Sequence, residues 1–121
     1  LCGISATPPH KEILKTALGA SNSVEWHYHN STELCIKELK QKGFEVIAVE
    51  MTTDSTSLEH KIFPKTPLAL IFGNEVMGIS KDILSLCDGA VEIPQVGTKH
   101  SFNISVSLGI VLWEYFRQVR L

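Results

Sequence analysis

The stretch PLALIFGNEVMGIS, residues 67–80, decides the fold. It begins with an apolar run of strand length, which is followed at once by Gly73. The loop after this glycine carries one carboxylate, Glu75, and Ser80 then stands where it can cap a short helix over residues 81–87. A strand, a glycine-containing loop and a helix in this order form the typical unit of an α/β protein.

The neighbouring segments repeat this pattern. Buried strands are predicted over residues 44–50 and 89–94, and a weakly alternating strand over residues 24–29. A helix is predicted over residues 30–43, capped by Asn30 or Ser31. The alternation predicts an α/β fold with a mainly parallel sheet flanked by helices.

We expect this fold to form one domain over residues 1–121, which is enough chain for one modest core. In parallel sheets, ligands bind at the carboxyl ends of the strands. The two unusual loops of the sequence, residues 73–80 and 94–101, both follow predicted strands. They are therefore the predicted site.

The C-terminal segment can be interpreted in two ways. Its beginning, SFNISVSL (101–108), alternates as a strand does, but the whole apolar stretch is too long for a typical strand. We therefore predict a helix. One apolar stripe consists of Ile104, Leu108, Val111, Leu112, Tyr115 and Val119, and a second of Val106, Ile110 and Trp113. A helix that is apolar on two sides is buried on two sides, which favours a homodimer through this helix over a single chain that covers both sides.

Composition narrows the class of protein. No apolar run approaches the roughly 20 residues that span a bilayer, so no membrane segment is expected. Cys2, Cys35 and Cys87 form no CxxC pair, which is typical of a reducing, cytoplasmic compartment. The histidines match no zinc pattern, so no metal is predicted. The formal net charge of −2 does not by itself indicate a nucleic-acid-binding protein.

The first loop alone leaves two interpretations open. Gly73 and Gly78, followed by Ile79 and Ser80, have the spacing of a phosphate loop. Ile79 occupies the place of the lysine that faces the phosphates, so nucleotide hydrolysis is not expected. A degenerate nucleotide-binding loop and a plain strand-to-helix turn both remain.

The second loop narrows the choice. Ile93 and Pro94 end a strand, Gly97 allows a turn, and Ser101 and Asn103 stand at the start of the predicted helix. One of these two polar residues could be the N-cap and no more. Polar groups at the N-terminus of an apolar helix are also positioned to contact a ligand.

Together, FGNEVMGIS and IPQVGTKHSFNISVSLGI resemble the second and third motifs of the SpoU/TrmH-type RNA ribose methyltransferases of the SPOUT superfamily. The upstream segment GISATPPHKEILKTALGASNSVEW is similar to the tRNA guanosine branch. The resemblance implies an enzyme that transfers a methyl group from S-adenosyl-L-methionine to a ribose 2′-hydroxyl of tRNA or, alternatively, rRNA. It also implies a C-terminal trefoil knot and a homodimer.

The same resemblance implies roles for individual residues. Phe72, Gly73, Ile93 and Phe102 match the cofactor-binding positions, where Gly73 would open the backbone to the ligand. The catalytic positions of the family match Glu75, Ser101 and Asn103. A ribose hydroxyl is a poor nucleophile, so it has to be aligned with the methyl group and relieved of its proton.

The sequence departs from the family pattern at three points. Phe102 stands where the family usually has leucine, and Gln95 where it has methionine. The first family motif, which contains the catalytic arginine, is absent, and neither Arg117 nor Arg120 takes its place. The chain is then expected to lack the N-terminal strand and helix of the domain, and the alternative function is a catalytically incomplete fragment that binds cofactor or RNA.

Overall fold

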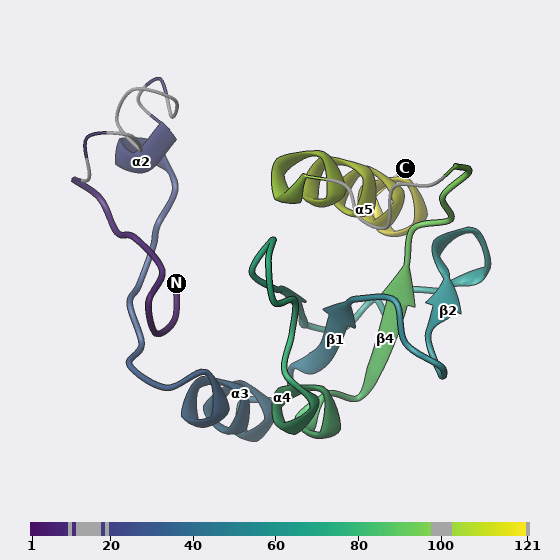
Figure 1. Cartoon of the computed structure of the whole chain (residues 1–121), viewed down its shortest axis with the longest axis horizontal. Helices are drawn as coiled ribbons and strands as arrows, with labels where there is room; N and C mark the ends of the chain where they lie inside the picture. The colour runs from purple at the N-terminus through teal and green to yellow at the C-terminus, as the bar shows by residue number, and fades with distance from the viewer. Residues whose placement is uncertain (10, 12–17, 19, 98–102, 121) are drawn as a thin grey trace. The chain divides into compact units, whose positions relative to one another are not determined.

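Figure 1 shows the computed structural model of the chain, which describes residues 1–9, 11, 18, 20–97 and 103–120. The chain forms two compact units, Leu1–Cys35 and Ile36–Leu121. None of the described helices is long and apolar enough to cross a membrane.

The described residues of the first unit contain little regular structure. Its helix α2 covers Ala20–Ser23. Cys2 and His29 form an isolated parallel bridge, in which the Gly3 amide donates to the His29 carbonyl at 2.9 Å. The strand predicted over residues 24–29 is therefore wrong apart from this bridge. Among the residues that the structure describes, the segment around Cys2 is what pairs with it, and this segment is too short to form a strand.

The second unit is built on a four-stranded parallel sheet, as the sequence predicted. Its strands are β1 (Glu45–Val49), β2 (Thr56–Ser57), β3 (Leu68–Phe72) and β4 (Gly89–Glu92), in the order β2-β4-β1-β3. All three pairings are parallel. Strand β2 was not among the predicted strands, because two residues are too few to show an alternating pattern.

The register brings the strand ends together. Val49 at the end of β1 pairs with Phe72 at the end of β3, and also with Val91 of β4. The loops that follow β1, β3 and β4 therefore leave the sheet at the same edge.

The two faces of the sheet bury different sets of side chains. On one face, Ile47 and Val91 pack with Val111 of helix α5 (Ile104–Val119). Val46 and Ala48 alternate with Ile47 and are also fully buried, so they fill the opposite face. In Figure 1, α5 and the short helix α4 (Lys81–Leu86) lie on opposite sides of the sheet.

Helix α3 (Thr32–Gln41) begins and ends as its sequence predicts. The Ser31 hydroxyl accepts a hydrogen bond from the Leu34 amide at 3.2 Å. Gly43 has a positive φ of 87°, and the Phe44 amide then reaches back to the Leu39 carbonyl at 3.0 Å. This pair of features is a Schellman ending, which a residue with a side chain would strain.

Helix α5 confirms the choice of helix over strand, but its apolar faces differ from the predicted stripes. Only Val111 is fully buried. Leu108 and Leu112, predicted on the same stripe, are 40% and 45% exposed. Further large apolar side chains of α5 are exposed in the single chain, namely Val106, Trp113 and Phe116. The buried side is narrower than predicted because one sheet face covers only one side of the helix.

Candidate cleft at the carboxyl ends of the strands

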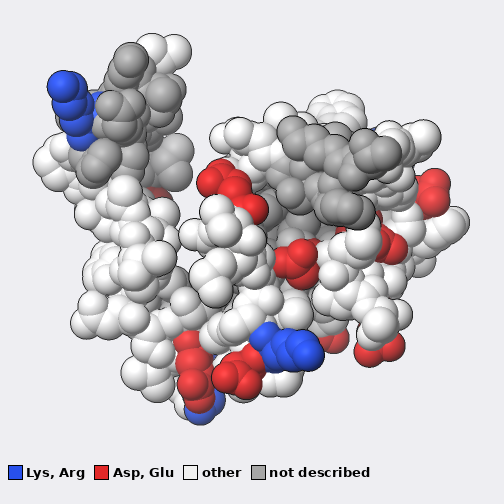
Figure 2. Space-filling model, viewed as in Figure 1, with Lys and Arg blue, Asp and Glu red and all other residues white. Residues whose placement is uncertain are grey.

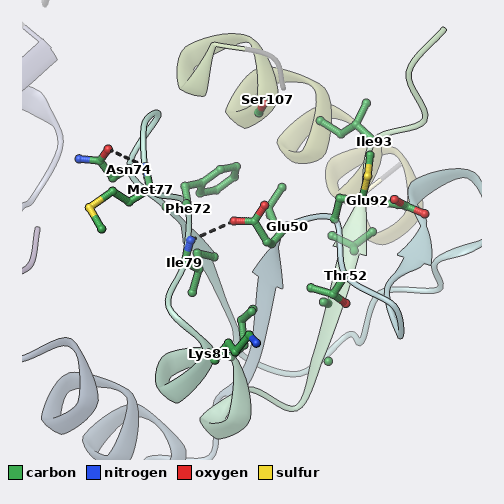
Figure 3. Close-up of a pocket in the computed structure, with 18 of the residues that line it drawn as sticks. Glu50, Thr52, Phe72, Asn74, Met77, Ile79, Lys81, Glu92, Ile93 and Ser107 are labelled. Atoms are coloured by element: carbon green, nitrogen blue, oxygen red, sulfur yellow. Dashed lines mark hydrogen bonds between the residues drawn. The ribbon is translucent and has the colours of Figure 1, made fainter. Parts of the chain in front are cut away.

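A cleft of about 1110 Å³ opens at the sheet edge where β1, β3 and β4 end. Its walls come from residues 49–54, 72–79 and 88–93, from Lys81, Leu84, Ser85 and Gln95, and from Ile104 and Ser107 of α5. Figure 3 shows Phe72 and Ile93 on its walls, with Ser107 above them on the helix. The two loops predicted to form the site thus contribute to one cleft, together with a third segment after β1.

The loop after β3 packs tightly on itself. A Cβ atom at Gly73 would lie 2.5 Å from the Gly78 carbonyl carbon and 2.7 Å from the Ile79 nitrogen. The Gly78 amide donates to the Asn74 carbonyl at 2.7 Å, and the Val76 amide donates to Asn74 Oδ1 at 2.7 Å. The space on the Cβ side of Gly73 is therefore filled by the chain's own backbone, which is a packing reason for glycine that the sequence did not indicate. The expected access for a ligand at Gly73 stays a prediction.

Glu50 holds the far end of this loop. Its Oε2 accepts a hydrogen bond from the Ile79 amide at 2.9 Å, and a Cβ atom at Gly78 would lie 2.7 Å from the same oxygen (Figure 3). Gly78 also has a positive φ of 67°, so this position requires glycine for two reasons. The sequence analysis missed Glu50. A carboxylate directly after a buried strand is the signal that could have identified it.

These contacts leave the loop poorly suited to phosphate. A phosphate loop offers free backbone amides to the anion. Here the Val76 and Met77 amides donate to Asn74 Oδ1, and the Ile79 amide donates to a carboxylate. A carboxylate beside the loop would also repel a phosphate. The geometry therefore disfavours the degenerate nucleotide-binding loop.

The charged side chains of the cleft are mostly acidic. Within the described part of the chain, the carboxylates that line it belong to Glu50, Asp54, Glu75, Asp88 and Glu92, and Lys81 also lines it. Figure 2 shows acidic side chains at several points around the hollow. Such a cleft favours a cationic or neutral ligand over an anionic one.

Asp88 has a structural role at the base of the cleft. Its Oδ2 accepts from the Val46 amide at 2.8 Å, and its Oδ1 lies 3.2 Å from Lys40 Nζ. The Val46 hydrogen bond is the main cause that holds the pKa of Asp88 below its usual value, with Lys40 also contributing. Burial raises the pKa of the neighbouring Cys87 thiol, and the Asp88 charge raises it further. Asp88 thus fastens the start of β1 rather than facing a ligand.

The predicted cofactor-binding residues are described in part. Phe72, Gly73 and Ile93 line the cleft. Phe102 lies outside the described residues.

The predicted catalytic residues have different placements. Glu75 is exposed and lines the cleft. Ser101 lies outside the described residues. Asn103 is the N-cap of α5, where its Oδ1 accepts from the Ser105 amide at 2.8 Å, and the next residue, Ile104, lines the cleft. The structural role that the sequence left open for Asn103 is therefore present.

A parallel sheet with a cleft at its carboxyl edge, walled by a glycine loop and a long helix, defines an α/β ligand-binding domain. Residues 2–113 match the SpoU rRNA Methylase family, and the chain belongs to this family.

Two curated relatives illustrate the match. A tRNA (guanosine(18)-2′-O)-methyltransferase of Thermus thermophilus is 34% identical over 104 residues, which are 86% of this chain and 53% of the relative. A 23S rRNA (guanosine-2′-O-)-methyltransferase RlmB of Neisseria meningitidis is 35% identical over 116 residues, which are 96% of this chain and 44% of the relative. The chain thus spans about half the length of these relatives.

A solved structure supports the fold. The S-adenosylmethionine-bound rRNA methyltransferase from Sinorhizobium meliloti superposes with a TM-score of 0.90 at 25% identity, over 100% of this chain and 46% of that one.

Proposed function

We propose that the protein carrying this chain is an S-adenosyl-L-methionine-dependent RNA methyltransferase that modifies a ribose 2′-hydroxyl, with tRNA guanosine favoured over rRNA. Membership of the SpoU family supports the reaction class. The names of the relatives, one a tRNA and one an rRNA guanosine 2′-O-methyltransferase, support an RNA substrate and a guanosine target.

The chemistry of the cleft is the observation that carries the proposal. Its loop amides are occupied, a carboxylate faces the loop, and Phe72 and Ile93 offer apolar walls. These features fit a ligand that has an adenine ring but no phosphates. S-adenosylmethionine is such a nucleoside, and its sulfonium is a cation that acidic surroundings stabilise.

We assign the residues as follows. Phe72, Gly73, Ile93 and Phe102 hold the adenosyl part, and when bound the cofactor supplies the methyl group. Ser101 and Asn103 orient the ribose hydroxyl by hydrogen bonds at the start of α5, and Glu75 orders the polar groups at the mouth of the cleft. The proton of the hydroxyl has to be removed during the transfer.

The assembly is also part of the proposal. Residues 1–121 form one SpoU-type methyltransferase domain in a cytoplasmic protein. The exposed apolar side of α5, which includes Leu112, Trp113 and Phe116, packs against a second copy in a homodimer. The chain after β4 passes through a trefoil knot, as in the SPOUT fold.

The test is methyl transfer from isotope-labelled S-adenosylmethionine to bulk tRNA and, separately, to rRNA, by the protein that carries this chain. A 2′-O-methyl group blocks alkaline cleavage of the next phosphodiester, so the label should be recovered in an alkali-resistant dinucleotide. Label in alkali-sensitive mononucleotides would contradict ribose methylation. Transfer to rRNA alone would contradict the tRNA preference. Donor binding with no transfer by the complete protein would favour the cofactor-binding fragment.

A further inference from the structure

Glu50 is the cleft residue that the proposed assignments do not use. It follows the last residue of β1 and is half-buried, and its carboxylate points toward the loop after β3 (Figure 3). Oε2 accepts the Ile79 amide at 2.9 Å. Among the described residues, Oε1 accepts no hydrogen bond. The side chain is thus fixed at one oxygen and available at the other.

We propose that Glu50 is a ligand-binding residue whose Oε1 accepts a hydrogen bond from the ribose hydroxyls of the adenosyl donor. This inference rests on the proposed function. An ionised carboxylate only accepts hydrogen bonds, and hydroxyl donors are its natural partners. Charge-assisted bonds of this kind are stronger than neutral ones.

The position of Glu50 in the sheet supports this role. It directly follows β1, the strand that lies between β3 and β4 in the sheet. The glycine loop follows β3, and Ile93 follows β4. In nucleotide-binding parallel sheets, an acidic residue near a neighbouring strand end commonly binds the ribose hydroxyls. An adenine that lies between Phe72 and Ile93 would keep its ribose near this middle strand.

The other carboxylates of the cleft fit the role less well. Asp88 is occupied by the Val46 amide and by Lys40. Glu75 lies on the exposed outer part of the loop. In Figure 3, Glu92 points away from the loop that Glu50 faces. Among the cleft carboxylates and contacts that the structure describes, Glu50 is the one fixed by the loop that it faces. Its side chain is therefore ordered before the ligand binds, which lowers the entropic cost of binding.

The experiment is calorimetry of the chain with S-adenosylhomocysteine and with an analogue that lacks both ribose hydroxyls. The variant Glu50→Gln keeps the size of the side chain and an acceptor for the Ile79 amide, but it removes the charge. S-adenosylhomocysteine should bind this variant about tenfold to a hundredfold more weakly than the native chain. The analogue should bind both with nearly equal affinity. The control Glu59→Gln makes the same change at an exposed carboxylate that does not line the cleft, and it should leave both affinities unchanged.

The outcomes separate the inference from the proposed function. If the native chain does not bind S-adenosylhomocysteine, the proposed function fails. Equal binding of S-adenosylhomocysteine by the native chain and Glu50→Gln overturns the inference alone. An equal loss for both ligands also overturns it, because Glu50 then acts only through the loop. If Glu50→Gln does not fold, the test uses the native chain alone. The analogue should then bind the native chain at least tenfold more weakly than S-adenosylhomocysteine does, and equal binding of the two ligands overturns the inference.

Discussion

Replacing Gly73 with alanine tests the packing of the loop on which the cleft is built. The added methyl group would lie 2.5, 2.7 and 2.8 Å from three backbone atoms of Gly78 and Ile79. Real Cβ contacts are longer than this, and backbone atoms cannot turn aside as the end of a side chain can. The loop therefore has to move as a unit, and the hydrogen bond between the Ile79 amide and Glu50 has to lengthen or break.

The expected cost follows from these contacts. Overpacking by one methyl group in a tight site costs about 1–3 kcal/mol. The upper part of this range already includes the loss of the hydrogen bond from the Ile79 amide to the charged Glu50 carboxylate. Since a domain of this size has a free energy of unfolding of about 5–15 kcal/mol, Gly73→Ala should fold but be clearly less stable.

Urea unfolding measures this cost. The midpoint should fall with little change in slope, because the surface exposed on unfolding is the same. Gln41→Ala, at the exposed end of α3, is the control and should leave the midpoint nearly unchanged. The reasoning is refuted if Gly73→Ala is as stable as the native chain and binds S-adenosylhomocysteine equally well.

Three further changes test other parts of the account. Asn103→Ser keeps a good N-cap, whereas Asn103→Ala should lose about 1 kcal/mol of stability. Both variants should lower methyl transfer by the protein that carries this chain. Full activity in the serine variant would exclude a catalytic role for Asn103. Arg117, and then Gln118, lower the pKa of Glu114 to about 2, so the stability that Glu114 contributes is complete above pH 4.5 and is lost as the pH falls toward 2. Thermal melts of Glu114→Gln should therefore change less with pH in this window, and an unchanged pH dependence would show that the pair contributes nothing. Gln118→Ala removes the hydrogen-bond partner of the Phe63 amide and of the Lys61 carbonyl, and it should lower the free energy of unfolding by about 1–3 kcal/mol. Gln41→Ala, on the exposed end of α3, should change the stability little in the same thermal melt.

The main strands and helix α3 could be predicted because their signals are local. The apolar run at Leu68–Phe72 stands between a proline and a glycine, and Ser31 and Gly43 stand at the two ends of α3. Each signal acts within a few residues, so it can be found without knowledge of the neighbours. The two-residue strand β2 could not be predicted in this way, since only its pairing with β4 defines it.

The part of the site that the sequence could not supply depends on contacts between distant segments. Glu50 and Ile79 are 29 positions apart, and nothing near Glu50 in the sequence indicates its partner. The packing reason for Gly73 was missed for the same reason, because the atoms that fill the space on its Cβ side belong to Gly78 and Ile79. Leu108 and Leu112 were predicted on the same stripe as Val111 but are exposed in the single chain, because periodicity alone does not show how much of a helix one sheet face can cover.

The most direct test of the central claim, that the cleft binds a phosphate-free adenosyl ligand, is a pair of calorimetric titrations of this chain. One uses S-adenosylhomocysteine and the other uses ATP at the same concentration. The account predicts saturable one-to-one binding of S-adenosylhomocysteine and no measurable heat with ATP. Binding of ATP without binding of S-adenosylhomocysteine would contradict the account.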